Sequence, residues 1–214
     1  MKKNIVLLSL LALAVLPVFA GPFGLKMGMT LEEIAEQCEE FPRHVMNDVY
    51  QIMPKKRHPL FIDYVAFISE SKGLYEVRAV TEKIETNKFG TELQDAFHNV
   101  KDRISKTYGS PKIKDGLNPN TTSSSQRDER WFYTLREGER ELVACWSIDV
   151  ALEDGLDMVI LECCGDSGLS GLYGDILHNV FSMLGRDGGL YGYLQLYYYF
   201  QNANTVEDEQ DSVF

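Results

Sequence analysis

The order of hydrophobic patterns along the chain constrains its fold more than any other feature of the sequence. A helical pattern at 29–41 is followed by three strand-like patterns, at 44–53, 60–69 and 74–85. The order then repeats, because a helical pattern at 87–111 is followed by strand-like patterns at 130–136, 141–152 and 156–164. This repetition predicts an α+β fold made of two similar helix-plus-antiparallel-sheet units in tandem.

These two units set the expected domain boundaries. The expected ranges are a signal peptide at 1–20, a first unit at 21–87, a second unit at 88–202 and an acidic tail at 203–214. The second unit gains a helix at 172–184 and a final strand at 191–202. We expect the acidic tail to be disordered.

The first twenty residues have the pattern of a secretory signal peptide. Lys2 and Lys3 precede an apolar run, and Val18-Phe19-Ala20 forms a cleavage site of the usual kind. We expect cleavage after Ala20 and a location in the bacterial periplasm or outside the cell. The apolar run is too short to span a bilayer as a helix, so no stable membrane insertion is expected after cleavage.

The mature chain is strongly acidic. Without Lys2 and Lys3 it has 19 basic and 32 acidic residues, a net charge of −13 with neutral histidines. Such a surface repels nucleic acid and anionic lipid headgroups, so neither is an expected partner. It suits either simple solvation or a basic protein partner.

Two of the helical patterns carry clear end signals. Thr30 and Glu33 form a capping box, while Gly109 and Pro111 end the second helix. The residues expected to point inward are Leu31, Ile34, Ala35, Cys38 and Phe41 in the first helix, and Leu93, Ala96, Phe97, Val100, Ile104 and Tyr108 in the second.

The four cysteines are disulfide candidates, because export favours their oxidation. A hairpin with Asp154-Gly155 as a two-residue turn would place Cys145 opposite Cys164. Cys163 would point to the other, apolar face, where it could meet Cys38. Buried thiols are the alternative. No metal site is expected, because no histidine lies near the cysteines at ligand spacing.

The segment 165–168, Gly-Asp-Ser-Gly, resembles the sequence around the nucleophile of trypsin-like serine proteases. Such a protease also needs an oriented base histidine and an oxyanion hole. The upstream histidines His44, His58 and His98 do not fit that pattern, and the helices disagree with an all-β family. We therefore interpret Ser167 as a turn residue or as the N-cap of the helix that follows.

The last strand carries the candidate binding surface. Its period-two alternation places one set of residues toward the core, namely Leu194, Leu196, Tyr198 and Phe200. The opposite face carries the candidate binding residues Tyr191, Tyr193, Tyr197 and Tyr199, together with Gln195. This tyrosine face could lie under a helix, or it could be open to a partner, since Tyr combines apolar area with a hydroxyl group.

Two short motifs resemble a known family. Gly28-Met29-Thr30 before the first helix and Gly109-Ser110-Pro111 after the second resemble the SmpA/OmlA (BamE-like) envelope modules and the tandem fold of the β-lactamase inhibitor protein. The chain departs from the envelope lipoproteins because no lipid-anchoring cysteine follows the signal peptide. The resemblance implies a protein-binding scaffold without catalysis.

Taken together, these patterns predict an exported, non-catalytic module that binds another envelope or secreted protein and needs no cofactor. An inhibitor or immunity protein against a basic enzyme is the first alternative, because the acidic surface would attract such a partner. An enzyme of unrecognised type is the second. The sequence contains no phosphate-binding loop, HExxH, paired Cys-x-x-Cys or dinucleotide fingerprint.

Overall fold

The computed structural model describes residues 21–119, 121, 130–147, 152–166 and 189–206. The helical elements are η1 (Pro22–Gly24), α1 (Leu31–Gln37), α2 (Thr91–Tyr108), α3 (Trp131–Arg136) and η2 (Glu153–Gly155), where η marks a 3₁₀ helix. The strands are β1 (Arg43–Met46), β2 (Val49–Ile52), β3 (Phe61–Ser69), β4 (Gly73–Thr81), β5 (Ile84–Thr86), β6 (Lys112–Leu117), β7 (Arg140–Ser147), β8 (Leu156–Gly165) and β9 (Leu190–Phe200).

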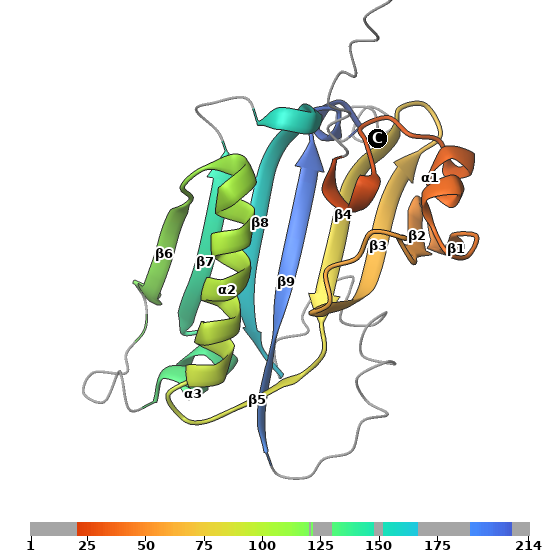
Figure 1. The fold of residues 1–214 in the computed structure, drawn as a ribbon. Helices are drawn as coiled ribbons and strands as arrows, with labels where there is room; N and C mark the ends of the chain where they lie inside the picture. Colours follow the sequence, from red (N-terminus) through yellow and green to blue (C-terminus); the bar gives the residue numbers. More distant parts are fainter. Residues whose placement is uncertain (1–20, 120, 122–129, 148–151, 167–188, 207–214) are drawn as a thin grey trace, which may run out of the picture.

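All of these strands belong to one antiparallel sheet. The strand order is β1-β2-β3-β4-β9-β8-β7-β6, and β5 also pairs with β9 (Figure 1). The last strand in the chain therefore lies between β4 of the first half and β8 of the second. The predicted α+β fold of two units in tandem is wrong. Segments 21–87 and 88–202 contribute strands to a single, mainly β structure because β9 pairs with both.

The break between β4 and β5 shows how β9 keeps its pairing along its whole length. Val77 pairs with Tyr198 before the break, and Ile84 pairs with Gly192 after it. At the break the Leu194 N–H donates to the Thr81 hydroxyl, at 3.0 Å, instead of to a strand carbonyl. A side chain thus satisfies the backbone where the ladder is interrupted, as a buried N–H requires.

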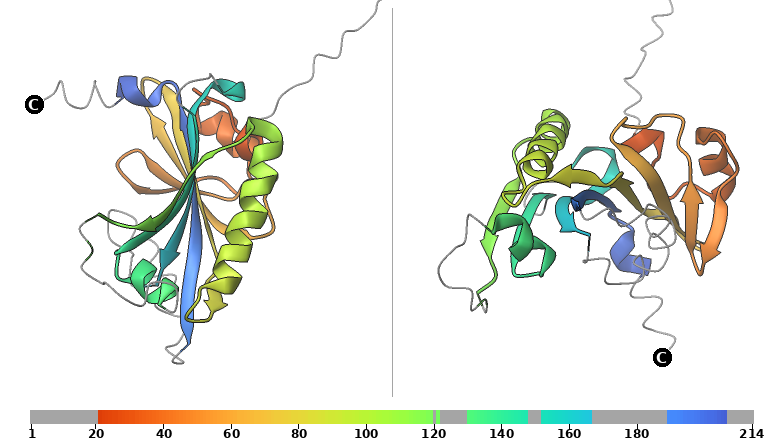
Figure 2. Two further views of the ribbon diagram at one scale, coloured as in Figure 1. Left: turned by 90° about the vertical axis from the view of Figure 1, so that its left-hand side faces the viewer. Right: turned by 90° about the horizontal axis from the view of Figure 1, so that it is seen from below.

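Helix α2 covers one face of the sheet, which we call the α2 face. It contacts β5, β8 and β9 and lies along the sheet (Figures 1 and 2). Four of its predicted inward residues are buried, namely Leu93, Phe97, Val100 and Ile104. Helix α2 packs closely on the sheet at Gly192. A Cβ at this position would lie 2.6 Å from the Leu93 Cδ2 atom and 2.8 Å from the Cys164 carbonyl oxygen.

Residues 21–38, which we call the N-terminal segment, cover another part of the α2 face. The capping box of α1 is confirmed, because Glu33 N–H donates to the Thr30 hydroxyl at 3.3 Å and Thr30 N–H donates to the Glu33 carboxylate at 2.9 Å. The helix ends at Gln37 instead of continuing to 41, since Cys38 forms a β-bridge with Pro54.

Three local predictions from the second half need correction. The predicted strand at 130–136 is the helix α3, whose buried Trp131, Phe132 and Leu135 pack at the ends of β7 and β8. Short apolar runs of this kind do not distinguish helix from strand by periodicity. Strand β6 was not predicted, because its residues are mostly exposed and polar. The β7–β8 hairpin places Cys145 opposite Ile160, not Cys164, because η2 lengthens the connection.

The two faces of the sheet differ in their packing. The predicted inward residues of β9 do lie on the α2 face, in the main core that also includes Leu142, Trp146, Val159 and Leu161. A smaller apolar cluster lies on the opposite face, formed by Val49, Val65, Phe67, Tyr75, Ala203 and Val206. Residues 203–206, at the start of the predicted disordered tail, form a helical turn with Ala203 and Val206 buried. Residues 207–214 lie outside the described part of the chain.

Candidate binding cleft

A cleft of about 450 Å³ opens on the α2 face, between α2 and the N-terminal segment. Its α2 wall consists of Val100, Arg103, Ile104, Thr107 and Tyr108. The opposite wall and the ends consist of Gly21, Pro22, Phe23, His58, Phe61 and Asp154, and the floor is formed by Leu196 and Tyr198 of β9. The cleft exists because α2 and the N-terminal segment cover separate parts of the sheet (Figure 1).

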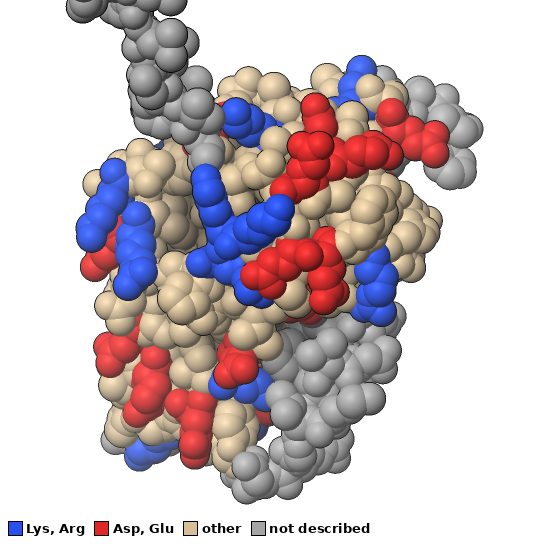
Figure 3. Space-filling view, turned by 45° about the vertical axis from the view of Figure 1, so that its right-hand side comes forward, with Lys and Arg blue, Asp and Glu red and all other residues tan. Residues whose placement is uncertain are grey.

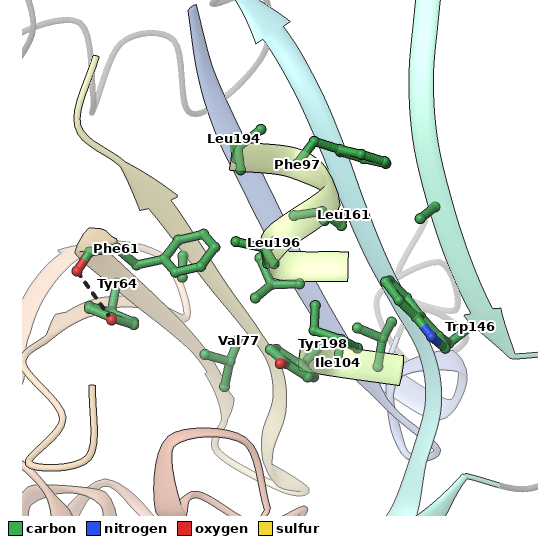
Figure 4. Packing of buried hydrophobic residues seen from close by; sticks show 14 of the residues in the cluster. Phe61, Tyr64, Val77, Phe97, Ile104, Trp146, Leu161, Leu194, Leu196 and Tyr198 are labelled. Atoms are coloured by element: carbon green, nitrogen blue, oxygen red, sulfur yellow. Dashed lines mark hydrogen bonds between the residues drawn. The ribbon is translucent and has the colours of Figure 1, made fainter. Parts of the chain in front are cut away.

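The floor and the inner walls are apolar and well ordered by aromatic contacts. Figure 4 shows Phe61 and Tyr64 on one side, Ile104 of α2 on the other, and Leu196 and Tyr198 between them. The Phe23 ring packs edge-on against Tyr64 and Tyr198, with centroids 4.9 and 5.6 Å apart. The Tyr64 hydroxyl donates to the Phe61 carbonyl, and burial raises the pKa of Tyr64 to about 12, so this side chain is neutral.

The mouth of the cleft carries two nitrogen-bearing side chains in contact. The Arg103 Nη1 atom of α2 lies 3.3 Å from the His58 Nε2 atom, and the Leu60 N–H donates to His58 Nδ1 at 3.2 Å. Burial, and then the charge of Arg103, lower the pKa of His58. In the space-filling view, Lys and Arg side chains gather near the centre of the visible face, beside Asp and Glu side chains (Figure 3).

Two residues that line the cleft have unusual backbone conformations. Phe23 (φ 59°) and Asp154 (φ 66°) lie in the left-handed region, and among the described non-glycine residues only Asn47 shares it. This conformation is costly for a bulky side chain such as Phe. Strain of this kind persists where the surrounding packing enforces it, and it concentrates at functional sites. The contacts of the Phe23 ring with Tyr64 and Tyr198 hold the Phe23 backbone in this conformation.

The predicted tyrosine surface lies on the opposite face and is only partly accessible. Tyr193 is 1% exposed and lies opposite Cys164 of β8 in the strand pairing. Tyr191, Tyr197 and Tyr199 are half-buried. The structure therefore brings the four residues onto one strand face, as the alternation predicts, but Tyr193 is a packing residue there.

Cross-strand contacts organise the middle of that face. The Arg78 guanidinium lies over the Phe67 ring on β3 and the Tyr197 ring on β9, with distances of 4.8 and 5.1 Å to the centroids. Arg78 also forms an ion pair with Glu76, and Tyr197 stacks on Tyr199 at 6.2 Å. These polar groups already have partners within the sheet.

None of the four cysteines forms a disulfide, so the predicted disulfides are wrong. Cys145 and Cys164 share a face, but Cys145 is opposite Ile160, four residues along β8 from Cys164. That offset is about 13 Å along the strand, whereas bridged Cα atoms lie within about 7 Å. Cys38 and Cys163 are both buried on the α2 face, as predicted, but the strands between them keep them apart.

The other sequence-based candidates add no site to the described part of the chain. Ser167, the rest of the Gly-Asp-Ser-Gly motif after Asp166, and the predicted helix at 172–184 lie outside it. In the described ranges, no three His, Cys, Asp or Glu side chains are placed to hold a metal ion. No helix within the same ranges is long and apolar enough to cross a membrane.

Comparison of the chain with protein-family models, with curated proteins and with solved structures finds no match. The fold and the cleft thus define the class of protein by architecture alone. In the described part of the chain, it is an antiparallel sheet protein whose long helix α2 covers one face, with a cleft beside that helix.

Sequence reasoning missed this cleft. The sequence places His58 in a basic turn and predicts Ile104 and Tyr108 as inward residues of a helix, but it gives no sign that these positions meet. Arg103 offered one usable signal, because it is a cation next to the buried stripe of α2. The contact between α2 and the turn at His58 depends on the position of β9 in the strand order, between β4 and β8.

Proposed function

We propose that the protein is an exported, non-catalytic binding protein that holds its ligand in the cleft between α2 and the N-terminal segment. The cleft itself carries this proposal. Ligand sites in proteins are concave, have volumes of roughly 300–1,000 Å³, and combine apolar walls with a few placed polar groups. The volume of about 450 Å³, the aromatic floor and the polar mouth at His58 and Arg103 all fit that description.

Export is part of the proposal and rests on the signal-peptide pattern of residues 1–20. Cleavage after Ala20 would keep every described residue of the cleft, because the first of them is Gly21. The position of Gly21 is fixed by packing, since it is buried and a Cβ there would lie 2.1 Å from the Leu25 carbonyl oxygen. Sequencing of the secreted protein should give Gly21 as the first residue, and an intact N-terminus would contradict export by this route.

A non-catalytic role agrees with the polar contacts in the cleft. A nucleophile needs a base within hydrogen-bond reach, and the base needs a group that orients it. The His58 ring contacts the cation Arg103 and a backbone amide, and within the described residues the ring has no hydrogen bond to a carboxylate or a hydroxyl group. This arrangement favours holding a ligand over activating a nucleophile.

A bulky residue in the cleft tests the proposal. Thr107→Trp introduces an indole at an exposed lining position of α2, and Asp102→Trp introduces one at an exposed position of the same helix that does not line the cleft. With the neutral probe octanol, titration calorimetry should show saturable binding to the native protein and to Asp102→Trp, and at least a ~10-fold loss in Thr107→Trp, because the indole would occupy the ligand's space. Equal binding by all three proteins would reject the cleft as the site.

A second candidate is a protein contact through the opposite face of the sheet. It is favoured by the half-buried Tyr197–Tyr199 stack and by Arg78 beside it, since Tyr and Arg are enriched where proteins meet. The resemblance of Gly28-Met29-Thr30 to the SmpA/OmlA modules supports the same proposal.

An affinity pull-down from the envelope fraction tests this second candidate. A protein recovered by the native chain should be lost with Tyr197→Ala/Tyr199→Ala and retained with Tyr50→Ala, a half-buried tyrosine of β2 on the other face. Recovery that is unchanged by the double substitution would reject the tyrosine surface as the contact.

A further inference from the structure

We propose that the ligand of the cleft is a small amphipathic anion, whose charged group lies between Arg103 and the Nε2–H of His58 and whose apolar body lies on Phe61, Leu196 and Tyr198. This inference rests on the proposed binding function and adds the chemical class of the ligand. Three features of the cleft carry it: a conflict between hydrogen-bond donors, an unbalanced charge and the arrangement of apolar surface.

The donor conflict arises at the His58 ring. A backbone amide can only donate, so the Leu60 N–H requires His58 Nδ1 to accept, which places the ring proton on Nε2. Nε2–H then faces the Arg103 guanidinium, also only a donor, at 3.3 Å. The other tautomer satisfies Arg103 but turns Nδ1–H toward the Leu60 amide. Neither neutral tautomer satisfies both contacts.

An anion at the mouth of the cleft removes this conflict. A carboxylate, sulfonate or phosphate oxygen accepts from both Nε2–H and the guanidinium, while Nδ1 keeps its bond from Leu60. Two donors that point at each other without an acceptor therefore have the geometry of an anion site. Arg103 and His58 come from α2 and from the turn before β3, so the anion would also tie the two walls of the cleft together.

The charge at Arg103 is also unbalanced in the described structure. Arg103 forms no ion pair with a carboxylate of the described residues, whereas Arg57, Arg78, Arg130 and Arg140 each have one. Among the described residues that line the cleft, Asp154 is the acidic one. A Cβ on Gly21 would lie 3.6 Å from the Asp154 Cβ, so the α-ammonium group created by cleavage after Ala20 would lie near Asp154. Arg103 is left to pair with a ligand.

The apolar surface next to these donors sets the other half of the ligand. Phe61, Leu196 and Tyr198 are all buried, and they line the same cleft as the two donors. A fully polar ion would gain no apolar contact from this lining, and an uncharged apolar molecule would leave the donor conflict in place. A molecule with an anionic end and an apolar body satisfies both parts.

Three probes of equal chain length separate these possibilities. Octanoate, octanol and octyltrimethylammonium should be titrated by calorimetry into the mature protein, Gly21 to Phe214. Octanoate should bind at least ~10-fold more tightly than octanol, since hydrogen bonds to charged groups are stronger than neutral ones. The cation should bind most weakly. Arg103→Gln should make octanoate and octanol equal, while Lys106→Gln, one turn away on α2 and outside the cleft, should keep the preference.

The outcomes distinguish the two proposals. Equal affinity for octanoate and octanol in the native protein, with both lost in Thr107→Trp, would overturn the anion and leave the binding function standing. No binding of either probe would overturn both. A preference for octanoate over octanol that survives Arg103→Gln would place the anion elsewhere and overturn this inference.

Nuclear magnetic resonance of the His58 ring gives a second readout. An anion on Nε2–H stabilises the imidazolium form, so octanoate should raise the pKa of His58 and octanol should not. Among the described residues, the charged and titratable groups that line the cleft with His58 are Arg103 and Tyr108 on α2, Asp154 on η2 and Tyr198 on β9, and Tyr64 of β3 donates to the His58 carbonyl. A His58 pKa that octanoate leaves unchanged would remove His58 from the site.

Discussion

The two faces of the sheet are made by the same strands, yet they bury their side chains in different ways. On the α2 face, β9 presents Leu194, Leu196 and Phe200, none more than 2% exposed. On the opposite face the same strand presents Tyr197 and Tyr199, which are half-buried; Tyr197 contacts Arg78 and stacks on Tyr199. Alternation along a strand determines which residues share a face, but the elements outside the sheet determine how deeply that face is buried.

The comparison also explains where a site can form. The polar groups in the middle of the opposite face have partners within the sheet: Arg78 pairs with Glu76 along β4 and contacts Tyr197 across on β9. On the α2 face the gap between α2 and the N-terminal segment leaves Arg103 and His58 at the mouth of an apolar cleft. Incomplete helical cover, more than the sheet itself, creates the candidate binding site.

The largest expected difference between the faces concerns stability. Phe97→Ala removes a fully buried ring between α2 and the sheet, and it should lower the free energy of unfolding by about 3–5 kcal/mol. Tyr199→Ala, on the half-buried opposite face, should cost about 1 kcal/mol. Urea denaturation followed by circular dichroism measures both values. Equal losses would show that the opposite face contributes as much to the core as the α2 face.

A glycine pair tests how closely α2 approaches the sheet. Gly192→Ala would place a methyl group 2.6 Å from the Leu93 side chain and close to backbone, so it should cost about 1–3 kcal/mol through overpacking. Gly116→Ala on the edge strand β6 is the control, because nothing lies within 4 Å of its Cβ position. Its effect should stay within about 0.5 kcal/mol. If both variants unfold at the same urea concentration, the helix is not held as closely as described.

A carboxyl group on the opposite face should make stability depend on pH. Burial raises the pKa of Glu162 above its ordinary 4.5; the Tyr197 hydroxyl opposes this shift, and the charge of Glu141 adds to it. The folded state therefore binds the proton more tightly than the unfolded state. This contribution to stability is fully present below pH 4.5 and is lost as pH rises through the folded pKa.

Glu162→Gln removes that titration. As pH rises from 4 to 7, the native protein should lose unfolding free energy at this group and Glu162→Gln should not. The stability of the variant relative to the native protein should therefore increase over this range. Glu85→Gln, at an exposed position of β5, serves as the control and should follow the native pH profile. Parallel profiles for Glu162→Gln and the native protein would mean that Glu162 is solvated on this face.

Much of the local structure could be predicted from the sequence, because it depends on neighbours in the chain. The capping box at Thr30 and Glu33, the buried stripe of α2 and the two faces of β9 all follow from spacing. The tandem arrangement was wrong because strand order is a long-range property. Nothing within residues 190–200 indicates that both edges of this strand are paired, with β4 on one side and β8 on the other.

The candidate cleft could not be predicted for the same reason. Its lining comes from distant parts of the chain, from Gly21 through His58 and Arg103 to Tyr198. The disulfide prediction failed at a finer scale. A two-residue turn at Asp154-Gly155 would pair Cys145 with Cys164, whereas the longer connection through η2 places Ile160 opposite Cys145.

The smallest expected effect concerns these thiols. Because all four cysteines are free, dithiothreitol should leave the midpoint of thermal unfolding unchanged. Cys145 and Cys164 are both half-buried, but burial raises the pKa of the Cys164 thiol, so thiol labelling of the native protein should modify Cys145 first. Cys38, Cys163 and Cys164 should react slowly, because burial raises the pKa of each thiol and the thiolate is the reactive form.

Cys163 belongs to the α2 face and Cys164 to the opposite face, so slow labelling of both would show that the two faces are equally closed at this end of β8. Rapid labelling of Cys164 alone would show that the opposite face opens there, and a fall in the unfolding midpoint with dithiothreitol would show that a disulfide forms after all.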